Sequence, residues 1–221
     1  PGRSRRDGTV SPLEKRGVIG TVRSLEDGVR GGTRLLYILA ASHSGSTLLA
    51  MLLGCHPEIC TVGEIKLGAL GNVDEYRCSC REPIRKCPFW RDVGREMERR
   101  GHSFDIATPE TDFQGIDSRY IRYFLCPLHR EVFRERLRDL ALSLSPGWRE
   151  ILPRILSRNE ALIETLCALA GKRIVVDSSK VGIRLKYLLR SPGLDVRIIR
   201  LVRDGRAVSL TYMDPARFAD A

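Results

Sequence analysis

Three apolar-rich runs, each followed at once by polar residues and a helical pattern, constrain the fold more than any other feature. The runs are residues 34–41, 173–177 and 196–203, and helical patterns follow at residues 46–57, 182–190 and 205–213. Residues 34–41 form a continuous rather than an alternating apolar run, which is typical of a strand buried in a parallel sheet. Helices that connect parallel strands form right-handed crossovers. We therefore predict an α/β fold with a P-loop-like parallel sheet flanked by helices and a site at the strand carboxyl ends.

The segment between the first two strands predicts a helical and loop-rich insert. Residues 58–92 contain Gly, Cys and Pro and are predicted as loops, with helices at 93–101, 128–144 and 158–170. Residues 1–33 are predicted to be a flexible basic segment, and residues 34–221 one α/β domain. We expect a fragment that is truncated at the C-terminus and can lack activity.

Positive charge is concentrated in a part of the chain that must be folded. The net charge is +10, and residues 172–206 carry 10 basic and 3 acidic side chains among their apolar positions. A folded basic face favours an anionic ligand. A noncatalytic module that binds polyanions stays an alternative, but 6% aromatic residues do not favour nucleic acid as the partner.

The stretch AASHSGSTLL, residues 40–49, lies where the first strand gives way to a helix. Unpaired backbone N–H groups at a helix start bind anions, and Ser44, Gly45, Ser46 and Thr47 would supply them, while the hydroxyls could cap the helix. Compared with the nucleoside triphosphate loop, Ser46 takes the place of the lysine. The loop is therefore suited to one phosphate rather than a triphosphate. An ordinary strand–helix connection is the alternative.

A second phosphate-binding pattern follows the last strand. LVRDGRAVSLTYM, residues 201–213, places Arg203 at a strand end and the hydroxyls of Ser209 and Thr211 on the next helix. The planar guanidinium group suits phosphate, and a helical hydroxyl could donate to the same group. The alternative is a surface pair between Arg203 and Asp204.

Together the two motifs resemble the sulfotransferase superfamily that uses 3′-phosphoadenylyl sulfate, of the carbohydrate or bacterial type. SHSGSTLL is similar to its 5′-phosphosulfate loop, and LVRDGRAVSLT is similar to its 3′-phosphate motif, with Thr211 in place of serine. His43 occupies the loop position where relatives carry lysine or arginine. The resemblance implies 3′-phosphoadenylyl sulfate as co-substrate, no required metal, and a hydroxyl-bearing small molecule or glycan as acceptor.

The resemblance also implies catalytic residues. Glu64, after the first helix and a His-Pro turn, looks like the base of heparan-type sulfotransferases, and Lys180 of VDSSK like the lysine near the transferred sulfate. His43 would add a cation. The alternatives are a structural carboxylate that pairs with Lys66 or an arginine, and an ordinary solvated lysine. His56 and His102 are weaker candidates for the base.

The segment CSCREPIRKCPFW, residues 78–90, carries three cysteines. Cys78, Cys80 and Cys87 lack a fourth ligand at zinc spacing, so a Cys80–Cys87 or Cys78–Cys87 link, or free thiols in a substrate loop, is favoured over a metal site. The chain has seven cysteines, an odd number that favours a reducing, cytoplasmic compartment.

One further alternative concerns the class of protein. A nucleotide or small-molecule kinase would need a lysine in the loop, where this chain has Ser46, and a metal-binding carboxylate. No run of 18 apolar residues occurs, so we expect no membrane-spanning segment.

Overall fold

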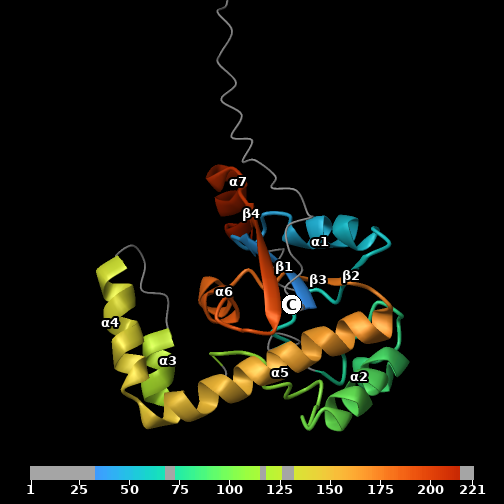
Figure 1. Ribbon diagram of the computed structural model, residues 1–221. Coiled ribbons are helices and arrows are strands. Elements are labelled where there is room, and N and C mark those ends of the chain that lie inside the picture. The colour runs from blue at the N-terminus through green and yellow to red at the C-terminus, as the bar shows by residue number, and fades with distance from the viewer. Residues whose placement is uncertain (1–32, 68–72, 115–117, 126–131, 215–221) are drawn as a thin grey trace, which may run out of the picture. The chain divides into compact units, whose positions relative to one another are not determined.

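A computed structural model describes residues 33–67, 73–114, 118–125 and 132–214 of the chain (Figure 1). Residues 31–221 form one compact unit. The predicted flexible segment, residues 1–33, lies outside the described residues except for Thr33, so its flexibility stays a prediction.

The sheet has four parallel strands in the order β2-β3-β1-β4. The strands are β1 (Thr33–Ala40), β2 (Ile59–Thr61), β3 (Ile174–Asp177) and β4 (Leu194–Leu201). The predicted α/β class and the three predicted strands are therefore confirmed. The prediction of loops throughout residues 58–92 is wrong at β2, whose three residues are too few to show a periodic pattern.

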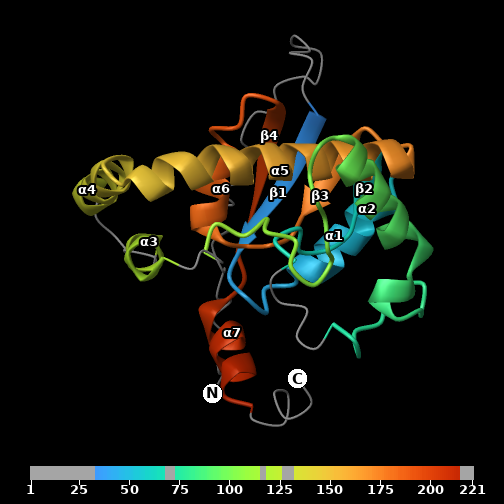
Figure 2. The same cartoon turned by 90° about the horizontal axis from the view of Figure 1, so that it is seen from below.

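Alternate side chains of β1 point to opposite faces of the sheet, and each face is covered by helices. Leu35 and Tyr37 join the larger core cluster with side chains of α5 (Pro146–Ala170) and α6 (Gly182–Leu188). Ile38 packs in a second cluster with Ala50 of α1 (Ser46–Gly54). Figures 1 and 2 show α5 and α1 on opposite sides of the sheet. This burial of both faces explains the continuous apolar pattern of β1.

The remaining helices are η1 (Ile84–Lys86), α2 (Pro88–Arg99), α3 (Arg119–Leu125), α4 (Val132–Ser143) and α7 (Gly205–Tyr212). Three predictions need correction: α2 and α5 begin earlier than expected, and α3 was not expected at all. Helix α5 begins at Pro146, where the Ser145 side chain accepts a hydrogen bond from the Trp148 backbone N–H. The internal Pro153 concealed this start in the sequence, because proline ordinarily interrupts helices. Within the described ranges, no helix has the length and apolarity needed to cross a membrane.

Candidate active site

Strand order brings the three polar segments to one edge of the sheet. Strand β1 lies between β3 and β4 and is parallel to both, so the segments that follow these strands leave the same edge. Arg203, after β4, donates a hydrogen bond from Nη1 to the backbone carbonyl oxygen of His43 at 2.7 Å. The loop of residues 43–47 and Arg203 are therefore neighbours, as the sequence predicts.

The loop after β1 has an unusual backbone. His43 and Gly45 both have left-handed conformations, with φ of 60° and 90°. Glycine adopts this region freely, whereas other residues pay a cost of about 1–2 kcal/mol. The strained residue is His43, and its carbonyl accepts the hydrogen bond from Arg203. The His43 ring also makes an edge-on contact with the Tyr212 ring, with 4.8 Å between the ring centroids. The loop conformation thus depends on contacts with the segment after β4.

The expected hydroxyl cap of α1 is absent. Gly45 is the N-cap residue, and among the described residues no side chain caps this helix with a hydrogen bond. Ser44 and Ser46 are buried, while Thr47 is exposed. The prediction of capping is therefore wrong, because glycine rather than a hydroxyl residue occupies the N-cap position. The start of α1 is left suited to an external anion.

Glu64 lies in a segment that is held at the end of β3 by backbone hydrogen bonds of the residues before and after it. The backbone N–H of Ile65 donates to Asp177 Oδ1 at 3.3 Å, and that of Lys66 donates to Ser179 Oγ at 3.2 Å. The Ser178 N–H in turn donates to the carbonyl of Gly63 at 3.1 Å. Glu64 is therefore held beside the carboxyl end of β3.

A buried polar network anchors this arrangement. Arg184 of α6 and Asp177 are both fully buried, and Arg184 Nε donates to Asp177 Oδ2 at 3.0 Å. Arg184 also donates to Asn159 Oδ1 on α5 at 2.8 Å and to the carbonyl of Thr111 at 2.7 Å. Thr111 Oγ1 closes the network by donating to the carbonyls of Ile65 and Lys66. Asp177 thus orients its neighbours rather than facing solvent.

Sequence reasoning missed Arg184, which it treated as one cation of a basic segment. Arg184 precedes the buried residues Tyr187 and Leu188 by three and four positions, which places it on the buried face of α6. That spacing was the available signal. A buried arginine requires paired acceptors, and the sequence alone did not supply their positions.

Glu64 and Lys180 form an ion pair. Lys180 Nζ contacts Glu64 Oε1, and Lys66 Nζ lies 3.7 Å from Glu64 Oε2. Lys180 has a left-handed backbone with φ of 65°, a strained conformation of the kind that clusters at functional sites. The side chains of Glu64 and Lys180 are 33% and 20% exposed, so both can reach a ligand. The pairing of Glu64 with Lys66 that the sequence left open is present, together with the contact to Lys180.

Two cavities open on either side of the loop. The larger, about 820 Å³, is bounded by Thr47, Glu64 and Ser178 and by the three cysteines of residues 78–87. The smaller, about 250 Å³, is bounded by Ser44 and Arg203 and by neighbouring residues of β1 and β4. The start of the loop therefore lines the smaller cavity, and the first turn of α1 lines the larger one.

Two further residues predicted to contact phosphate, Thr211 and Ser209, do not lie as expected. Thr211 is buried, and its Oγ1 donates to the carbonyl of Ala207 at 3.0 Å within α7. Ser209 is exposed on the same helix. Asp204 caps α7 and pairs with Arg206 at 2.7 Å, so the expected alternative of an Arg203–Asp204 pair is wrong. A threonine hydroxyl inside a helix can donate to the backbone carbonyl four residues earlier, and here Thr211 does so.

His56 and His102, the weaker candidates for the base, have local roles. His56 Nδ1 accepts a hydrogen bond from the Glu58 backbone N–H just after α1, as expected for a residue at a helix end. His102 lies 3.4 Å from the Ser157 hydroxyl of α5 through its Nε2. Burial and the charge of Arg158 lower its pKa. Neither histidine lines the two cavities beside the loop.

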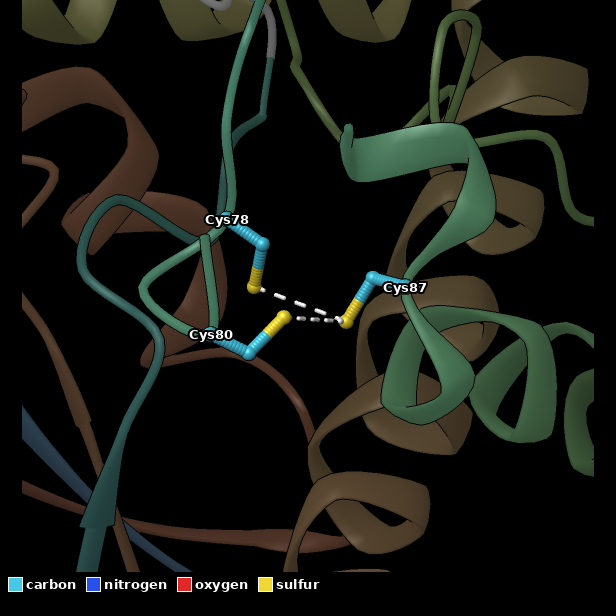
Figure 3. Close-up of side chains that lie close together, drawn as sticks. All are labelled: Cys78, Cys80 and Cys87. Carbon is cyan, nitrogen blue, oxygen red and sulfur yellow. Dashed lines mark hydrogen bonds between the residues drawn. The ribbon is translucent and has the colours of Figure 1, made fainter. Parts of the chain in front are cut away.

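The three cysteines of residues 78–87 are free thiols in contact. The Sγ atoms of Cys80 and Cys78 each lie 3.5 Å from Cys87 Sγ (Figure 3). Of the alternatives that the sequence favours, the structure thus has the free thiols and neither the Cys78–Cys87 nor the Cys80–Cys87 link. Burial raises the pKa of the Cys87 thiol.

Comparison with known proteins assigns no family: no family model matches the chain, and no curated protein or solved structure matches it significantly. The resemblance to sulfotransferases therefore rests on the two motifs themselves. The fold that carries them is an all-parallel α/β sheet flanked by helices.

Proposed function

We propose that the chain is a sulfotransferase that moves a sulfuryl group from 3′-phosphoadenylyl sulfate to a hydroxyl, with a saccharide as the candidate acceptor. The observation that carries the proposal is the hydrogen bond from Arg203 to the carbonyl of His43. It joins the two phosphate-binding motifs at neighbouring strand ends, where one nucleotide with a 5′- and a 3′-phosphate can reach both.

The donor would lie across the loop. Backbone N–H groups at the uncapped start of α1 would bind the 5′-phosphate, and Arg203 the 3′-phosphate beside the smaller cavity. A guanidinium group has five N–H donors, so its bond to His43 leaves others for phosphate. Ser46 in place of lysine suits a single 5′-phosphate and disfavours a kinase, which would grip a triphosphate. Ser209, exposed on α7, is a better second contact than the internally bonded Thr211.

The acceptor would occupy the larger cavity, which Glu64 and Thr47 both line. Glu64 would take the proton of the acceptor hydroxyl while that oxygen forms a bond to sulfur. The bond from sulfur to the bridging phosphate oxygen would break, which releases adenosine 3′,5′-bisphosphate. Lys180 would leave its contact with Glu64 and, with His43, stabilise the charge that grows on the bridging oxygen. The fixed positions of these residues at the sheet edge would hold the acceptor oxygen in line with the sulfur and the bridging oxygen.

Calorimetric titration with adenosine 3′,5′-bisphosphate tests this proposal without knowledge of the acceptor. Arg203→Ala should weaken binding by about 1.5–3 kcal/mol, the value of a hydrogen bond to a charged group. Arg85→Ala is the control, since Arg85 is an exposed arginine that pairs with Asp74 and Asp105 instead. Equal losses in both variants would indicate a diffuse polyanion site. Preference for ATP with magnesium over the bisphosphate would indicate a kinase.

A further inference from the structure

The thiols of Cys78, Cys80 and Cys87 have no part in the proposed transfer reaction. Cys78 and Cys80 lie on a tight turn closed by hydrogen bonds from the Cys78 N–H to Glu82 and from the Arg81 N–H to Cys78. Cys87 is the N-cap residue of α2. Figure 3 shows the three side chains pointing toward one another from the turn and from the start of the helix. Two separate elements therefore bring three soft ligands to one point.

We propose that Cys78, Cys80 and Cys87 bind a zinc ion through their thiolates. Tetrahedral zinc holds sulfur ligands at about 2.3 Å, which places them about 3.8 Å from one another. Two sulfur–sulfur distances here are 3.5 Å. All three sulfur atoms lie within 4.8 Å of one another. Two of the three sulfur–sulfur distances are thus within about 0.3 Å of the zinc value, and the third, between Cys78 and Cys80, is no longer than 4.8 Å, so a small approach of these two thiols completes one face of a zinc tetrahedron.

A metal accounts for the arrangement better than a disulfide does. A disulfide joins two sulfurs at about 2.05 Å and leaves a third thiol unused. Cys87 Sγ is equidistant from Cys78 and Cys80, so neither pair is selected. A metal ion uses all three thiols at once and needs no such choice.

The charges around the cluster suit bound zinc. Three thiolates and one divalent ion carry a net charge of −1, which a cationic surrounding stabilises. The segment YRCSCREPIRK, residues 76–86, contributes four basic and one acidic side chain.

The fourth position of the zinc ion would be open. In the part of the chain that the structure describes, the group of potential ligands contains these three cysteines and no fourth residue. All three line the cavity of about 820 Å³ that Glu64 and Thr47 also line. A water molecule or a cavity ligand would complete the tetrahedron, as in zinc sites that exchange ligands. The inference stands apart from the proposed function, because it uses only the sulfur geometry and the cavity.

Metal analysis of the chain, purified under reducing conditions and supplied with one equivalent of zinc, tests the site. We expect one zinc per chain after dialysis and, with cobalt(II) in its place, the visible absorption of a tetrahedral ion together with a thiolate charge-transfer band. Cys80→Ser should weaken zinc binding by about 10²–10³-fold, one ligand's share of the affinity of a structural zinc site. Cys80 is exposed, so this variant should fold.

Cys55→Ser is the matched control, because Cys55 is an exposed thiol outside the cluster. It should retain both the metal and the cobalt spectrum. Stoichiometric zinc that persists unchanged in Cys80→Ser would overturn the proposal, as would a reduced chain that retains no zinc. Mass spectrometry that finds a Cys78–Cys87 or Cys80–Cys87 disulfide in the reduced preparation would overturn it as well.

Discussion

Replacement of Asp177 by asparagine tests whether the buried network holds the candidate site together. Asparagine keeps the shape and one oxygen acceptor, which can still accept from the Ile65 N–H. Its amide NH₂ would take the place of Oδ2 opposite Arg184, where the carboxylate now accepts from Nε at 3.0 Å. Because both side chains are fully buried, the guanidinium would be left without its counter-charge and away from water.

Removal of one member of a buried ion pair costs about 3–5 kcal/mol, against a total stability of about 5–15 kcal/mol for a typical domain. We expect Asp177→Asn to lower the free energy of unfolding by that amount. Urea titration followed by fluorescence measures it, since Trp90 and Trp148 are both buried in the larger core cluster. Both tryptophans should report the same transition if unfolding is two-state.

The control is Arg173→Ala, which removes an exposed ion pair with Glu58 whose side chains are 74% and 47% accessible. Such pairs contribute about 0–1 kcal/mol, so this variant should be nearly as stable as the parent chain. A loss below about 1 kcal/mol for Asp177→Asn would refute the reasoning. It would mean that Arg184 finds water or another acceptor, and that the network does not anchor the Glu64 segment.

Two further predictions concern catalysis and pH. Glu64→Gln should lower sulfuryl-transfer turnover by about 10²–10⁴-fold and leave bisphosphate affinity unchanged, whereas a defect confined to affinity would make Glu64 structural. Burial opposes ionisation of Asp139, but the hydrogen bonds and charges of Lys186 and Arg190 outweigh it and lower its pKa. Asp139 therefore stabilises the fold above its unfolded pKa of about 3.9, and this contribution is lost as the pH falls through the lower folded value. Asp139→Asn should cost up to about 1 kcal/mol in urea titrations at pH 7 and progressively less below pH 4, and a cost that does not change with pH would contradict this assignment.

The sequence by itself determined three of the four strands and the polar segments after them. Apolar-rich runs followed by helical patterns identified β1, β3 and β4, and the run of β1 is continuous because this central strand is covered on both faces. Their parallel direction followed from the helices between them, and that direction brought the segments containing His43, Lys180 and Arg203 to one edge. Local patterns were sufficient here because each strand and the polar residues after it are adjacent in the chain.

Only the tertiary structure decided which side chains meet. The pairing of Glu64 with Lys180 joins residues 116 positions apart, and the bond from Arg203 to His43 joins residues 160 apart. The sequence placed Thr211 near phosphate, but its hydroxyl bonds to its own helix. It also gave no partner for Arg184, whose acceptors come from three separate elements. Contacts of this kind depend on how helices and loops pack over the sheet, and local sequence patterns do not encode that packing.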